Sequence, residues 1–235
     1  MGMARDILLL CLAGGVCALD STAVWQLMLS QPLVSSTIAG LVLGAPEVGI
    51  FVGIVLQLVW SGAVPVGARP MPDAPVGSLS GVWFAATLLE TNGFASPSFC
   101  YLLGVISALC IALVGRHTIL IEREISRKLF RGFIRRASAG EKAFPERVVA
   151  AAVAIAFARG FILCLLALVA LALIARLLAR NPAFSARDYG LTLLIIEALG
   201  AGVLFSVFVR RSRTRVLAFA GGLVWAFLVM NLSQR

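Results

Sequence analysis

The residues best suited to chemistry lie in one short stretch, 57–73, which mixes polar side chains with helix-breaking residues. It contains Gln57, Arg69 and Asp73, together with three prolines and two glycines. This composition cannot form a continuous helix, because proline lacks an N–H group and clashes with the preceding turn. Apolar residues flank the stretch on both sides, so we predict a broken backbone at membrane depth. Such a break exposes N–H and C=O groups that can line a polar substrate site.

Asp73 is the most informative of these residues, because an ionised carboxylate inside a membrane costs about 3 kcal/mol or more. It has two candidate functional roles, which are accepting hydrogen bonds from sugar hydroxyls and pairing with Arg69. A third possibility is an exposed turn, since Pro-Asp is common turn chemistry. The sequence alone leaves these alternatives open.

Two glutamines extend the candidate site. Gln57 ends an apolar segment and offers both an amide donor and an amide acceptor, which suit either a sugar or a neighbouring helix. Gln31 precedes Pro32, so we predict a helix break there and a second polar patch. We therefore expect the substrate-binding residues to be Asp73, Gln57, Arg69 and Gln31.

The sequence offers little for other kinds of chemistry. The five cysteines lie in apolar stretches without a Cys-x-x-Cys pair, and His117 is the single histidine. We expect no disulfide framework, no metal site and no cofactor. No Ser/His/Asp set or paired carboxylates stand out, so we also expect no catalytic residues.

Composition places the chain in a membrane. Of its 235 residues, 60% are hydrophobic and 13% are charged, against about 45–50% and about 25% in soluble domains. Its mean hydropathy is +1.00. The net charge of +9 is clumped between apolar runs, so we interpret it as a topology signal facing anionic lipid and expect no nucleic-acid binding.

Hydropathy predicts an all-α membrane protein, a multi-pass helical bundle with short broken or re-entrant helices, forming one domain over residues 1–235. A spanning helix needs about 20 apolar residues. Long segments fall at 6–29, 98–115, 148–175, 190–209 and 216–232, and short ones at 32–44, 47–63 and 76–90. Gly40, Gly44, Gly49 and Gly53 recur four apart in pairs, which favours close helix packing.

Basic loops predict the orientation. Residues 116–147 and 210–215 are rich in arginine, so the positive-inside rule places both in the cytoplasm and loop 176–189 outside. We divide the domain into N-terminal helices (6–115), a basic amphipathic cytoplasmic loop (116–147) and C-terminal helices (148–235). Apolar residues recur near helical spacing in 116–147, which predicts a surface helix that either anchors to lipid or docks a soluble partner.

From Gln31 to Ala74 the chain resembles the IIC subunits of the mannose/fructose/sorbose phosphotransferase family. The shared pattern is a Pro-Leu start at Pro32, glycines spaced four apart, Gly67-Ala68, and Pro72-Asp73-Ala74. The resemblance places Gln57 and Asp73 near the sugar. Gln57 stands where the family usually has glutamate, and Pro65 where asparagine is common.

The resemblance implies the sugar-translocating subunit of a phosphoenolpyruvate-dependent phosphotransferase system. It implies a multi-pass protein in the bacterial cytoplasmic (inner) membrane, in an oligomer with a IID membrane subunit. It also implies cytoplasmic IIA and IIB proteins and a hexose substrate. The two substitutions suggest an alternative, a non-transporting regulatory or scaffolding membrane anchor for phosphotransferase proteins.

Overall fold

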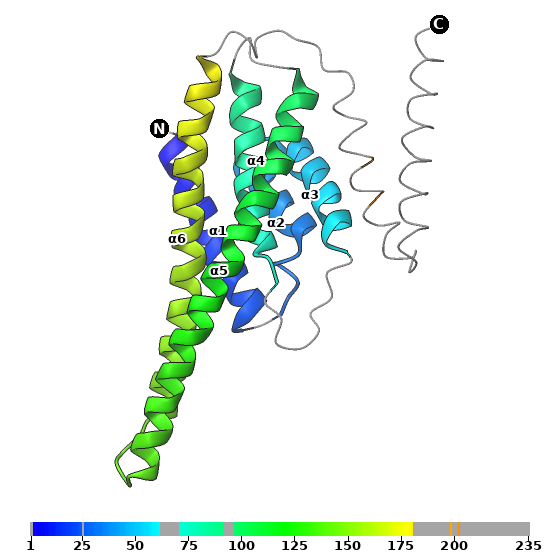
Figure 1. Cartoon of the computed structure of the whole chain (residues 1–235). Helices are drawn as coiled ribbons and strands as arrows, with labels where there is room; N and C mark the ends of the chain where they lie inside the picture. Colours follow the sequence, from blue (N-terminus) through cyan, green and yellow to red (C-terminus); the bar gives the residue numbers. More distant parts are fainter. Residues whose placement is uncertain are drawn as a thin grey trace, which may run out of the picture.

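A computed structural model describes residues 2–24, 26–61, 71–91 and 96–180, with positions 198 and 202. These residues form six helices and no strand, so the predicted all-α bundle is confirmed for them (Figure 1). The helices are α1 (Gly2–Thr22), α2 (Pro32–Val42), α3 (Pro46–Trp60), α4 (Ala74–Glu90), α5 (Pro97–Ser138) and α6 (Pro145–Ala179). The predicted segment 190–209, apart from positions 198 and 202, the segment 216–232 and the basic turn 210–215 lie outside the described residues.

Proline marks the start of five of these helices. Each of α2 to α6 carries a proline at its first or second position. There proline stabilises a helix start, because its fixed φ suits the first turn and its missing N–H would have no intrahelical partner. The prolines that make the sequence look discontinuous therefore divide it into separate helices.

Helices α2 and α3 form a tight apolar hairpin. They contain 11 and 15 residues, or about 17 and 23 Å of helix, which is shorter than the roughly 30 Å hydrocarbon core of a bilayer. The chain turns at Gly44, whose φ is +70°. A Cβ on Gly49 would lie 2.5 Å from the Ser36 carbonyl oxygen and 2.9 Å from the Gly40 Cα. The predicted close packing through glycines is confirmed for this pair.

Helix α4 lies at the centre of the bundle and is buried on nearly all sides. It packs against α5, and α1 packs against α6 (Figure 1). Both contacts use small residues: Gly81 of α4 faces the Gly104 carbonyl of α5, and Gly14 of α1 faces the Gly160 carbonyl and Cys164 of α6. These close approaches bring polar groups on different helices within hydrogen-bond range.

Helices α5 and α6 form a long hairpin that extends past the rest of the bundle (Figure 1). Both are long and apolar enough to cross a membrane. The sequence predicts a boundary between a span and a loop after residue 115, whereas α5 continues unbroken to Ser138. Residues 116–138 contain no proline but six arginines, one lysine and two glutamates, which are good helix formers. The turn follows at Gly140, whose φ is +74°.

The hairpin contact between α2 and α3 gives a first prediction. Gly49→Ala forces a methyl group against the Ser36 carbonyl, and overpacking of this kind costs about 1–3 kcal/mol. We expect a lower melting temperature in detergent, measured by intrinsic fluorescence. Gly132→Ala is the matched control, because nothing lies within 4 Å of a Cβ there. Equal melting temperatures for the two variants would contradict the close packing.

Candidate functional site

A polar cavity of about 520 Å³ lies where α1 ends, α2 begins, α3 ends and the chain enters α4. This volume falls within the range of about 300–1,000 Å³ that is usual for small-molecule sites. Its lining combines carboxylates, amides, hydroxyls and an indole. The lining residues are Asp20, Ser21, Thr22, Gln26, Met28, Ser30, Gln31, Pro32, Gln57, Trp60, Met71, Pro72, Asp73, Ala74, Pro75, Ile119 and Arg123.

The cavity brings together three of the four predicted site residues, Gln31, Gln57 and Asp73. The fourth, Arg69, lies outside the described residues. The cavity forms at the predicted break, since α3 ends at Trp60 and α4 begins at Ala74. Residues 71–73 between them are not helical.

Gln57 ties the end of α3 to the start of α2. Its amide nitrogen donates to the Gln31 Oε1 at 3.0 Å, and its Oε1 accepts from the Leu33 N–H at 3.3 Å. The interhelical hydrogen bond that the sequence left open is therefore present. A glutamine amide has two N–H donors and two acceptor lone pairs. These bonds consequently leave the pair with capacity to bind a ligand in the cavity.

Asp73 is buried, with 2% of its surface exposed, so the exposed-turn alternative is wrong. Its backbone N–H donates to the Ala112 carbonyl of α5 at 2.9 Å. A Cβ on Gly115 would lie 2.4 Å from the Asp73 Cβ. Asp73 therefore packs directly on the backbone of α5, and only glycine at position 115 leaves room for it.

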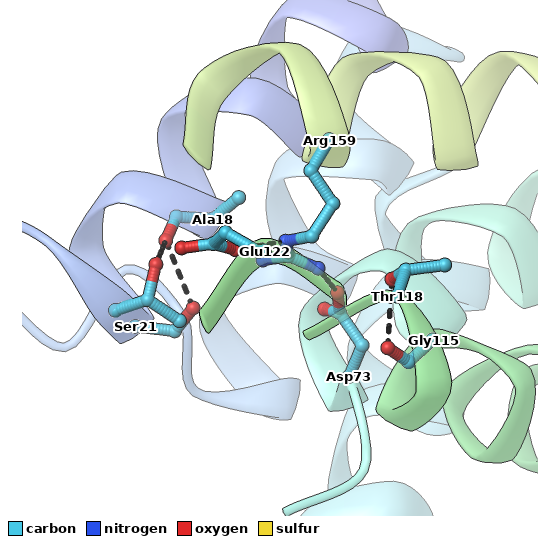
Figure 2. Close-up of polar contacts among 8 residues, drawn as sticks. Ala18, Ser21, Asp73, Gly115, Thr118, Glu122 and Arg159 are labelled. Carbon is cyan, nitrogen blue, oxygen red and sulfur yellow. Dashed lines mark hydrogen bonds and ion pairs between the residues drawn. The ribbon is translucent and has the colours of Figure 1, made fainter. Parts of the chain in front are cut away.

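Arg159 of α6 is the partner of Asp73 within the described part of the chain. Its Nη1 donates to Asp73 Oδ2, and its Nε donates to Glu122 Oε2 of α5 at 2.5 Å. The side chains of Arg159 and Glu122 are only 7% and 9% exposed. Figure 2 shows the two carboxylates meeting the guanidinium from different elements. We call Asp73, Glu122 and Arg159 the charge triad.

Two atoms of the charge triad are buried without a partner among the described residues, Asp73 Oδ1 and Arg159 Nη2. A buried polar atom without a hydrogen bond costs about 1–3 kcal/mol. Asp73 also contributes to the lining of the cavity, although this oxygen is itself buried. Its one unused acceptor therefore meets a ligand hydroxyl only if the carboxylate turns toward the cavity.

Asp20 also lines the cavity. Its carboxylate accepts hydrogen bonds from the Leu27 N–H and, at 2.8 Å, from the Ser30 N–H. These bonds hold the loop after α1, in which Gln26 and Met28 have φ values of 53° and 63°. Left-handed backbone is uncommon for residues other than glycine. Asp20 is therefore a loop-organising residue whose hydrogen-bonding capacity is largely used by the backbone.

Sequence reasoning missed Glu122, Arg123, Trp60 and Ile119 as parts of this region. Glu122 and Arg123 lie in the stretch read as a cytoplasmic loop, and nothing in their local pattern links them to Asp73. The pairing of Glu122 with Arg159 joins residues 37 positions apart on two helices. The nearest signal was the cost of placing Arg159 in an apolar segment, which requires a buried partner.

The residues described here contain no group of three or more His, Cys, Asp and Glu side chains arranged to hold a metal. The charge triad has two carboxylates, but a guanidinium already bonds both of them. Its geometry therefore suits hydrogen bonding to a neutral polar ligand better than metal coordination.

Comparison with known proteins identifies relatives in one family. The family described as "PTS system sorbose-specific iic component" matches residues 4–234. The mannose-specific EIIC component of Escherichia coli K12 is 29% identical over 116 residues, which are 49% of this chain and 38% of that protein. A putative N-acetylgalactosamine permease IIC component 2 of the same organism is 39% identical over 57 residues, 24% of this chain and 43% of that protein. The matches thus span under half the length of these curated relatives.

Two solved structures share the fold. The chain is similar to one in the cryoEM structure of the mannose transporter ManYZ in complex with microcin E492. That match has a TM-score of 0.62 and 17% identity, and it covers 96% of this chain and 87% of the other. A structure titled "Structure of membrane protein" matches with a TM-score of 0.61, 19% identity and the same coverage.

The charge triad gives a second prediction. Arg159→Leu leaves two carboxylates buried beside each other without a cation, and breaking a buried pair in this way costs about 3–5 kcal/mol. We expect a large fall in melting temperature or loss of the folded protein in detergent. Arg127→Leu is the control, because Arg127 pairs with Glu124 on the exposed surface of α5. If both variants had the same melting temperature, the charge triad would not be stabilising the bundle.

Proposed function

The chain belongs to the family of sorbose-specific IIC components of the phosphotransferase system, and we propose that it is the sugar-translocating membrane subunit of such a system. The observation that carries this proposal is the polar cavity at the break between α3 and α4. Broken helices that enclose a polar cavity are typical of substrate sites in secondary transporters. The chain's relatives with mannose-specific and N-acetylgalactosamine permease names support a sugar as the substrate.

The cavity offers the contacts that a hexose needs. Gln31 and Gln57 supply amide donors and acceptors, and Asp73 supplies a carboxylate oxygen that lacks a partner among the described residues. Trp60 lines the same cavity, and its indole ring has a large apolar surface. We propose that hydroxyls bind the amides and Asp73 while the C–H face of the ring packs on Trp60. Arg69, which the resemblance places close by, completes the proposed set.

We propose a multi-pass arrangement in the bacterial inner membrane, with the end of the α5–α6 hairpin in the cytoplasm. Residues 123–147 contain eight Lys and Arg against three Glu, which favours the cytoplasmic side. Ile119 and Arg123 line the cavity and lie beyond the apolar part of α5. The cavity in this conformation is therefore assigned to the cytoplasmic side of the membrane, where a soluble protein can reach its contents.

A groove of about 480 Å³ near the hairpin turn supports docking of a soluble partner. It is lined by four cations together with apolar side chains: Ile125, Lys128, Leu129, Gly132, Phe133, Arg136, Lys142, Ala143, Phe144, Arg147 and Val148. Anionic lipid would also suit the charge of this groove. However, Leu129 lies about 20 Å along α5 beyond Gly115, so the groove lies well past the apolar part of the helix and away from the membrane surface. We therefore propose that an acidic surface of a cytoplasmic IIB protein docks there.

The remaining partners follow from the same assignment. We propose that a IID membrane subunit covers part of the exposed apolar surface, that the complex is oligomeric, and that IIA and IIB carry the phosphoryl group. Large apolar side chains are exposed on the flank of α6, including Leu166, Leu173 and Leu177, and contact with lipid or another membrane helix would cover them. In this proposal the chain conducts sugar and contributes no catalytic residue.

Hexose binding tests the central claim. The protein, purified with its IID partner, is expected to bind a hexose in isothermal titration calorimetry. Asp73→Asn removes the charge while keeping the shape, and losing a hydrogen bond to a charged group costs about 1.5–3 kcal/mol, so we expect binding at least tenfold weaker. Asp6→Asn is the control, because Asp6 lies near the start of α1, outside the cavity lining.

Two results would contradict the proposal. Unchanged binding by Asp73→Asn would remove that residue from the site. No binding of any hexose by the wild-type complex, together with no uptake after reconstitution, would instead favour a non-transporting membrane anchor.

Docking at the hairpin groove has a separate test. The double variant Lys128→Glu, Arg136→Glu reverses two of the four lining charges, so we expect at least a tenfold loss of affinity for IIB in surface plasmon resonance. The control is Arg180→Glu, which lies beyond the other end of α6. Equal IIB affinity in the two proteins would exclude the groove as the docking site.

A further inference from the structure

Arg159 is shared between two carboxylates that differ in their surroundings. Asp73 borders the sugar cavity and Glu122 does not. Asp73 follows the non-helical residues 71–72 and precedes the first turn of α4, whereas Glu122 lies in the middle of α5. Asp73 is thus the member of the charge triad that both bonds the guanidinium and contributes to the cavity lining.

The hydrogen bonds of Asp73 present a difficulty for sugar binding. In this conformation its side chain is 1% exposed and one oxygen is bonded to Arg159. Turning this carboxylate toward a sugar weakens its bond to the guanidinium. If Asp73 were the only partner of Arg159, that movement would leave a buried cation unpaired, which is strongly destabilising.

Glu122 removes this difficulty. It bonds the Nε of the guanidinium, while Asp73 bonds Nη1, so the two carboxylates use different donors of the same fork. When Asp73 moves, Arg159 remains paired with Glu122. The two like charges near one cation also repel each other, which further favours release of Asp73.

We propose that Glu122 is a positioning residue for the sugar site, which retains Arg159 so that Asp73 can turn from the guanidinium to sugar hydroxyls. This inference rests on the proposed function, because it assumes that Asp73 binds the sugar. It assigns to Glu122 an effect on sugar affinity without any contact between Glu122 and the sugar.

The first test is a double-mutant cycle on hexose affinity. Glu122→Gln makes Asp73 the only charged partner of Arg159, so we expect hexose affinity to fall about tenfold by calorimetry. In the Asp73→Asn background the same change is expected to have no further effect, because the carboxylate to be released is gone. Glu124→Gln, two positions along α5 with a side chain 41% exposed, is the matched control and should bind as the wild type does.

A purely structural role for Glu122 predicts a different outcome. It predicts a lower melting temperature with unchanged affinity of the folded fraction, or an equal loss of affinity in both backgrounds. Either result would overturn the inference. If the wild-type complex bound no hexose, the proposed function itself would fail, and that outcome is distinct from wild-type binding that Glu122→Gln leaves unchanged.

A second measurement covers the case in which Glu122→Gln does not fold. Infrared difference spectra of the wild-type complex with and without hexose should contain a shifted carboxylate stretching band that is missing in Asp73→Asn. That band reports the exchange of a guanidinium partner for hydroxyl partners. A spectrum without any Asp73-dependent change would show that the carboxylate keeps its partner, and it would refute the proposed release.

Discussion

The burial of three charged side chains is the constraint on which the arrangement of this bundle depends. Arg159, Asp73 and Glu122 come from α6, from the entry to α4 and from α5. Each would be costly to bury alone, so these elements must meet at one point with hydrogen-bonding geometry. Asp73 is the only one of the three that also borders the cavity. The same interaction therefore fixes both the packing of the long hairpin and the position of the inner cavity wall.

Small residues make this meeting of charges possible. Asp73 packs on Gly115, and α1 reaches α6 through Gly14 and Gly160. Larger side chains at these positions would separate the helices, and a charged pair stretched in this way loses its hydrogen bonds before it loses its electrostatic attraction. The glycines of the α2–α3 hairpin act similarly, since their contact lets Gln57 reach Gln31. Backbone packing and site geometry are thus set by the same residues.

The sequence predicted the elements of the fold better than their connections. Prolines and apolar runs give the starts of α2 to α6, and the Gln31, Gln57 and Asp73 positions follow from helix breaks. The break expected after residue 115 does not exist, because charged residues with high helix propensity continue α5. The partner of Asp73 could not be predicted from the sequence, for a different reason. Pairing across 86 residues depends on how helices pack, and local pattern carries no information about that.

The replacement of the family's glutamate by glutamine at position 57 is best understood through charge. The family pattern that this chain resembles has glutamate there, beside a cavity that is already lined by Asp20 and Asp73. A third carboxylate would add like-charge repulsion, while glutamine keeps an acceptor and adds a donor. The structure uses both, because Gln57 donates to Gln31 and accepts from the Leu33 N–H. Under the proposed function, this amide pair replaces a charged sugar contact with a neutral one. Asp73 is then the carboxylate on which sugar binding depends, so its release from Arg159 becomes the step that controls affinity.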